Sequence, residues 1–118
     1  MGRRNCLLLL MLAVSVIVAC GPDTIFLRPA LDTPENHVKN GHSLLSRGKI
    51  DAANAEFVRA KTLDAEYAPA YVGLALVQAR QGDVEGGLTT LERAKALVAT
   101  PEQEQEVEDS LILIEEMQ

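Results

Sequence analysis

The chain has 118 residues, of which 47% are hydrophobic and only 3% aromatic, and its formal net charge is −6 at pH 7. This length fits one small domain, and the negative charge argues against nucleic-acid binding, which needs a basic surface. The two cysteines, Cys6 and Cys20, both lie near the amino terminus. A metal or redox site built on paired cysteines is therefore excluded from the rest of the chain.

Residues 1–19 are typical of a secretory signal peptide. Arg3 and Arg4 form a short basic start, and residues 7–19 are apolar apart from Ser15. This apolar run is too short to span a bilayer comfortably, and it ends in a small residue of the kind found at cleavage sites. We expect residues 1–19 to be removed; the alternative is an uncleaved membrane anchor.

The sequence Ile17-Val18-Ala19-Cys20 resembles the lipobox of bacterial lipoproteins. The resemblance implies that Cys20 carries a thioether-linked diacylglycerol and that the new amino terminus is acylated after cleavage. Because each buried CH2 contributes about 0.8 kcal/mol, three acyl chains would anchor the chain in the membrane permanently. Residue 21 is Gly and not Asp, which by the same resemblance favours the outer membrane, facing the periplasm. Residues 20–33 would then form the lipidated amino terminus and tether.

The next part of the chain consists of two blocks, residues 34–67 and 68–101, which align without a gap. Gly48 of the first block recurs as Gly82, 34 positions later. Each block has two apolar stripes at helical spacing, separated by that glycine, and glycine adopts the positive φ that ends a helix without a steric penalty. The pattern predicts helices over residues 34–47, 51–63, 68–81 and 84–98.

This pair of blocks resembles the tetratricopeptide repeat, which has the same period and a fixed order of small and bulky apolar residues. The residues that match the family pattern are Gly41, Ala53, Phe57 and Ala60 in the first block and Tyr71, Leu74, Leu91 and Ala94 in the second. The resemblance implies an all-α fold of two helix-turn-helix repeats, a fragment of an α-solenoid.

In this family, the first helix of each repeat lines a concave groove that binds other proteins. The residues at those positions here are Val38, His42, Leu45, Val72, Leu76, Ala79 and Arg80. By this resemblance, we expect a mainly apolar groove suited to an amphipathic helix or an extended apolar segment. The alternative is that these residues are covered internally, by the carboxyl-terminal segment or by a second copy of the chain.

Residues 102–118 are expected to form a helix that caps the last repeat. Thr100 is a good N-cap residue, and Pro101 suits the first helical position because its missing N–H would have no partner there. Four apolar residues share one helical face: Val107, Leu111, Ile114 and Met117.

The charge of residues 102–118 is one-sided, with seven acidic residues and no basic residue. The simpler interpretation is a solvated acidic helix face. The sharper interpretation is a docking surface for a basic partner. Ile112 points away from the apolar face and Leu113 lies at its edge, which is a weak hint of a contact with a partner.

The sequence offers no catalytic motif. It has no glycine-rich phosphate loop, no HExxH and no GxSxG. His37 and His42 lack a clear carboxylate partner at ligand spacing, so we expect neither a metal site nor a cofactor. We therefore do not expect an enzyme.

We expect a lipid-anchored protein-interaction module that serves as an adaptor or assembly factor in the bacterial envelope, of the pilus, secretion or outer-membrane assembly type. One alternative is a self-associating structural lipoprotein. Another is an accessory regulator of a cell-wall enzyme. Because helical repeat arrays usually need three or more units to bury their apolar faces, a homo-oligomer is a reasonable expectation.

Overall fold

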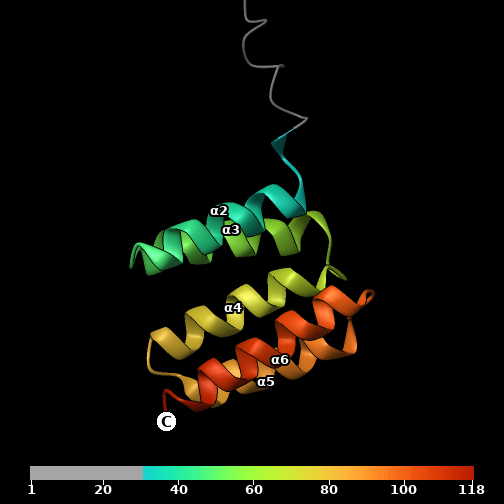
Figure 1. The fold of residues 1–118 in the computed structure, drawn as a ribbon. Helices are drawn as coiled ribbons and strands as arrows, with labels where there is room; N and C mark the ends of the chain where they lie inside the picture. Colours follow the sequence, from blue (N-terminus) through green and yellow to red (C-terminus); the bar gives the residue numbers. More distant parts are fainter. Residues whose placement is uncertain (1–30) are drawn as a thin grey trace, which may run out of the picture. The chain divides into compact units, whose positions relative to one another are not determined.

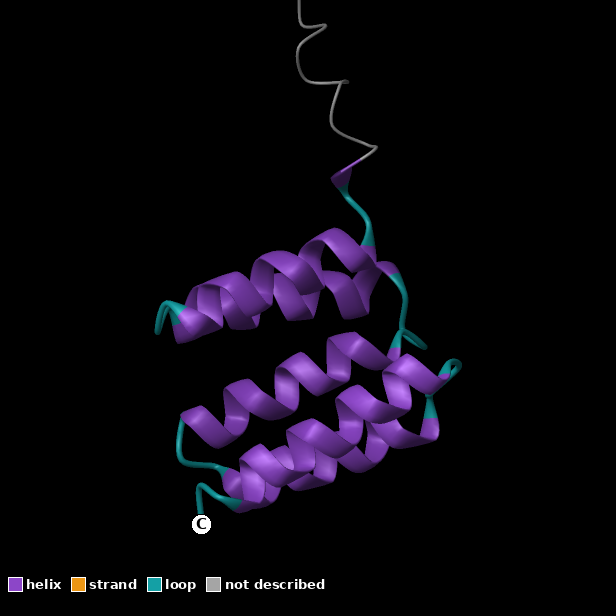
Figure 2. Cartoon of the chain, in the orientation of Figure 1, coloured by secondary structure: helices purple, strands orange, loops and turns teal. Residues whose placement is uncertain are grey.

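The computed structural model describes residues 31–118, and within them it contains five α-helices and no β-strand (Figures 1 and 2). The helices are α2 (Pro34–Ser46), α3 (Ile50–Leu63), α4 (Ala68–Arg80), α5 (Val84–Ala96) and α6 (Pro101–Glu115). The predicted all-α class is confirmed. The predicted signal peptide, the lipid attachment site Cys20 and the tether up to residue 30 lie outside the described residues.

Two of the helices begin with the same Thr-Pro signal. The hydroxyl of Thr33 accepts a hydrogen bond from the backbone N–H of Asn36 at 3.3 Å, and Thr100 accepts one from Gln103 at the same distance. The following proline lacks an N–H at a position where the helix has no partner for one. In α6 the Gln103 side chain also accepts a hydrogen bond from the N–H of Ala99 at 2.8 Å. The predicted start of α6 is confirmed.

The turns inside the two blocks have the same structure. Gly48 has a φ of 72° and Gly82 a φ of 92°, and these are the only positive values among the described residues. In both turns the N–H of the glycine donates to the carbonyl three residues earlier at 3.0 Å, and the N–H of the next residue donates to the carbonyl five residues earlier at 2.9 Å. Both predicted helix stops are confirmed, and the backbone repeats its hydrogen bonds 34 positions apart.

Helix α4 lies at the centre of the fold. It packs against α2 and α3 on one side and against α5 and α6 on the other (Figure 1). Ten of its 13 residues are buried, whereas α2 buries only Val38, Gly41 and Leu45. The two blocks therefore have similar backbones but different degrees of burial.

The residues that match the repeat pattern form the core. Gly41, Ala53, Phe57, Ala60, Tyr71, Leu91 and Ala94 are buried, and Leu74 is partly buried. Helix α6 contributes Val107 and Ile114 to the same core, with Leu111 and Met117 packed against it. The apolar stripe predicted for this helix therefore faces the rest of the fold.

Phe57 of α3 occupies a slot that two glycines create. Its side chain is 0% exposed. A Cβ atom on Gly41 would lie 2.6 Å from the Phe57 ring, and one on Gly73 would lie 2.2 Å from it. Because real side chains do not approach so closely, both glycines are needed for α2 and α4 to pack against this ring.

Candidate interaction surfaces

The residues predicted to line a concave groove do not share one environment. Val38 and Leu45 of α2 and Val72, Leu76 and Ala79 of α4 are buried in the core, and Val72 and Leu76 are only 1% and 9% exposed. His42 is partly exposed and Arg80 is exposed. A partner could therefore contact His42 and Arg80 directly, whereas reaching the five apolar side chains would require the helices to separate.

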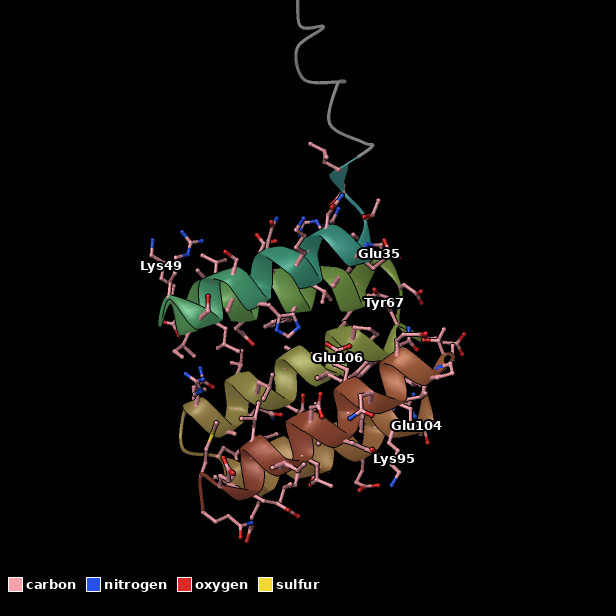
Figure 3. The ribbon with its side chains drawn as sticks, in the orientation of Figure 1. Glu35, Lys49, Tyr67, Lys95, Glu104 and Glu106 are labelled. Carbon is pink, nitrogen blue, oxygen red and sulfur yellow. The ribbon has the colours of Figure 1, made fainter. Side chains whose placement is uncertain are left out.

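The accessible part of this region is polar. His42 of α2 and Glu106 of α6 approach within 3.4 Å, so the capping helix reaches the first block. The imidazole packs edge-on against Phe57, with 5.2 Å between the ring centroids. Burial raises the pKa of Tyr67, and the carboxylates of Glu35 and Glu106 raise it further. We call Glu35, His42, Tyr67, Glu106 and the exposed Arg80 of α4 the α2–α6 face. Figure 3 shows Glu35, Tyr67 and Glu106 on one side of the fold.

The Nε2 atom of His42 is the one buried side-chain nitrogen or oxygen in residues 31–118 that makes no hydrogen bond. The ring nevertheless keeps much of its surface accessible, since 38% of the side chain is exposed. A small movement of Glu106 would bring the two groups into hydrogen-bonding geometry. Of the polar groups in this pair, the partly exposed Glu106 carboxylate is the one that an incoming partner can reach.

A second polar cluster joins the first helices to the segment before them. The ring of His37 lies between two carboxylates, with Nδ1 at 2.7 Å from Glu56 and Nε2 at 2.8 Å from Asp32. Arg59 of α3 forms a two-pronged ion pair with the same Asp32. Hydrogen bonds from Arg59 and His37 lower the pKa of Asp32 to about 2.

This cluster corrects the expectation that His37 has no carboxylate partner. Partial burial of the ring lowers the pKa of His37, but the hydrogen bonds to Asp32 and Glu56 outweigh that effect, and the net change is upward. The partners come from positions 5 residues before and 19 residues after the histidine. Only the packing of α2 on α3 brings Glu56 to the ring, so spacing along the chain gave no signal for it.

The cluster has the geometry of an ion-pair network. The cation Arg59 neutralises Asp32, which is the more exposed of the two carboxylates that contact His37. Within residues 31–118, no group of three or more His, Cys, Asp or Glu side chains is placed to hold a metal ion.

A groove with a volume of about 420 Å³ runs between α3, α4 and α5. Its lining includes Val58, Lys61, Tyr71, Leu74, Thr89 and Arg93, and none of its lining residues is acidic. The ammonium of Lys61 lies 5.5 Å from the centre of the Tyr71 ring, and the Tyr71 hydroxyl donates to the carbonyl of Ala65 at 2.7 Å. We call this concavity the basic groove.

The two cations of the basic groove have no carboxylate partner in the described part of the chain: no ion pair within 4.0 Å involves Lys61 or Arg93. Val58, which contributes to the wall, is 45% exposed. The groove therefore offers an anionic ligand two free positive charges beside an uncovered apolar surface.

A smaller crevice separates α5 from α6. Its volume is about 70 Å³, and it is lined by apolar residues such as Leu91 and Val107 with Lys95 and Glu104 among its polar residues (labelled in Figure 3). A space of this size holds one or two water molecules and is too small for a peptide side chain plus backbone. It is best described as a packing defect beside the cap.

The outer face of α6 carries the opposite charge from the basic groove. Glu108, Asp109 and Glu115 of this helix and its C-cap residue Glu116 are all exposed. Two large apolar side chains lie among them: Ile112 is 56% exposed and Leu113 is 48% exposed. The sequence placed Ile112 opposite the apolar face and Leu113 at its edge, and both side chains are exposed.

The chain matches no family model, no curated protein and no solved structure. Within residues 31–118, none of the helices has both the length and the apolar composition that crossing a bilayer requires.

Proposed function

We propose that this chain is a protein-interaction module of the tetratricopeptide type, held at the bacterial envelope by a lipid on Cys20 and acting there as an adaptor or assembly factor. The observation that carries the proposal is the repetition in the backbone. Two helical hairpins have the same turn hydrogen bonds 34 positions apart. The first packs on α4 of the second, and the terminal helix α6 packs against α4 and α5. Proteins built in this way usually function through the surfaces of the stacked helices.

The α2–α6 face is the surface that we assign to a client protein. Its apolar positions are used in the core, so recognition rests on its polar groups. Glu35 and Glu106 place two carboxylates near the Tyr67 ring, and both raise its pKa. A segment that carries Lys or Arg beside an aromatic or apolar side chain is the chemistry that fits this face.

Attachment to the membrane is tested separately from client binding. With Cys20→Ser, the full-length protein should incorporate no labelled fatty acid and should leave the membrane fraction, because the thioether would have no sulfur to form on. Cys6→Ser is the matched control and should change neither result. Fatty-acid label that persists in Cys20→Ser would contradict the lipobox assignment and leave the interaction surface unaffected.

Client binding is tested by photo-crosslinking in living cells from Glu35 and Arg80, two exposed positions of the α2–α6 face. The expected result is one heterologous envelope protein captured from both positions, and its loss when Glu106→Lys is added. A crosslinker at Ala52, exposed on α3, is the control. Capture of nothing, or equal capture from Ala52, would contradict an adaptor role for this face.

A further inference from the structure

The basic groove requires an acidic occupant, because its only charged lining groups are the cations Lys61 and Arg93. No ion pair involves either cation within residues 31–118. The apolar part of the lining, Val58 and Leu74, favours an occupant that also brings apolar side chains. The fitting ligand is therefore an amphipathic acidic segment.

The chain itself presents such a segment. On the outer side of α6, Asp109, Ile112, Leu113 and Glu116 recur at the spacing of neighbours on one helical face. All four are exposed, and the two carboxylates flank the two apolar side chains. Asp109 and Glu116 are separated by roughly 10 Å along the helix axis, from the 1.5 Å rise per residue. We call these four residues the acidic stripe.

A single copy does not bring these two surfaces together. The opposite side of α6 packs into its own core through Val107 and Ile114, which are 5% and 0% exposed. The acidic stripe consequently points away from the fold, whereas the basic groove opens between α3 and α5. The stripe can reach a groove only on another molecule.

We propose that the acidic stripe of α6 docks into the basic groove of a second copy of this chain. Docking pairs Asp109 and Glu116 with the two unpaired cations, and it covers Ile112 and Leu113 with the apolar wall of the groove. Because the two surfaces differ, one docked contact leaves one free groove and one free stripe in the pair. The two copies then either dock reciprocally into a two-fold dimer or extend head to tail into a ring or a linear array.

This association stands apart from client binding, because neither the stripe nor the groove includes a residue of the α2–α6 face. It depends on charge, so it weakens as salt rises and screens the exposed ion pairs. Two of the seven acidic residues of the carboxyl-terminal segment, Asp109 and Glu116, then have a defined partner.

The test uses the full-length protein in detergent, prepared as a mixture of ¹⁴N- and ¹⁵N-labelled copies, with a photo-crosslinker at Thr89 in the groove. The expected product joins Thr89 of one copy to residues 105–118 of a copy with the other label. A crosslinker at Lys49, an exposed loop position, should give at least about tenfold less of this product, as expected for a specific contact.

Charge reversal makes the test decisive. The groove variant Lys61→Glu/Arg93→Glu and the stripe variant Asp109→Lys/Glu116→Lys should each reduce the mixed-label product about tenfold or more, while their combination should restore most of it. The reversal Lys39→Glu/Lys49→Glu changes the same charge at exposed sites outside the groove and should leave the yield unchanged. All substituted residues are exposed, and circular dichroism checks that each variant is folded.

Three results would overturn the proposal. The first is a Thr89 product that joins only residues of the same copy. The second is a product with detergent or lipid alone, which would assign the groove to the membrane surface. The third is a combined variant that remains as weak as the single reversals, because complementary charge would then not hold the copies together.

Discussion

The two hairpins of this chain, α2–α3 and α4–α5, share a backbone pattern but differ in what surrounds them. Both turn at a glycine with positive φ and repeat the same hydrogen bonds. The first hairpin packs on its neighbour through one side and keeps a charged network on the other, whereas α4 of the second hairpin is enclosed by four helices. Equivalent positions in a repeat can therefore have opposite roles, because the place in the stack decides the burial.

The largest expected effect is on the free energy of unfolding, at a position that is equivalent in the two hairpins. This position is Leu76 in α4 and His42 in α2. Leu76→Asp should cost more than about 3 kcal/mol, since it removes a buried side chain and places a carboxylate in the core. His42→Asp should cost much less, because the imidazole is partly exposed. Urea unfolding followed by circular dichroism measures both. If Leu76→Asp kept the parental stability, Leu76 would be on a free surface and the enclosure of α4 would be wrong.

The next effect should be the same in both hairpins. Gly48→Ala and Gly82→Ala each force a Cβ atom into the left-handed region, which costs about 1–2 kcal/mol. A Cβ at either position meets no atom within 4 Å, so the backbone conformation is the only source of the cost. Thermal unfolding of the two variants measures it. Losses that differ by more than about 1 kcal/mol would show that the two turns are not equivalent.

The smallest effect concerns another equivalent pair, His37 and Tyr71. His37 has a raised pKa in the folded chain, so the native state binds more protons than the unfolded state above about pH 6.5. Its contribution to the free energy of unfolding is complete below that pH and is lost as the pH rises through the folded pKa. The Tyr71 hydroxyl instead donates to a backbone carbonyl.

Urea unfolding at about pH 5.5 and pH 8.5 checks this prediction, because the two values lie on either side of the pKa of an ordinary histidine. His37→Gln should remove the loss of stability at the higher pH, whereas His42→Gln, which removes the other described histidine, should keep it. Equal loss in the parent protein and His37→Gln would contradict the link to the Asp32–His37–Glu56 network. Asp32 adds a second pH dependence at acid pH. Because its pKa is lowered to about 2 in the folded chain, its contribution to the free energy of unfolding is lost as the pH drops below about 4.

The sequence by itself determined the helices, their turns and their starts. These features are local: Thr33 and Thr100 cap helices within three residues of themselves, and Gly48 and Gly82 end helices through their own φ. The gapless repeat also placed Phe57, Ala60, Leu91 and Ala94 in the core. Local hydrogen bonds and helical periodicity were enough because neither depends on how the helices later pack.

Only the tertiary structure decided which surfaces remain free. The five apolar residues predicted to line a groove are buried in the core instead, because α4 packs against both α2 and α6. Arg59 pairs with Asp32 from 27 positions away, and the basic groove combines residues from three helices. Side chains so distant in sequence become neighbours only when the helices stack, so no spacing along the chain could reveal the contacts between them.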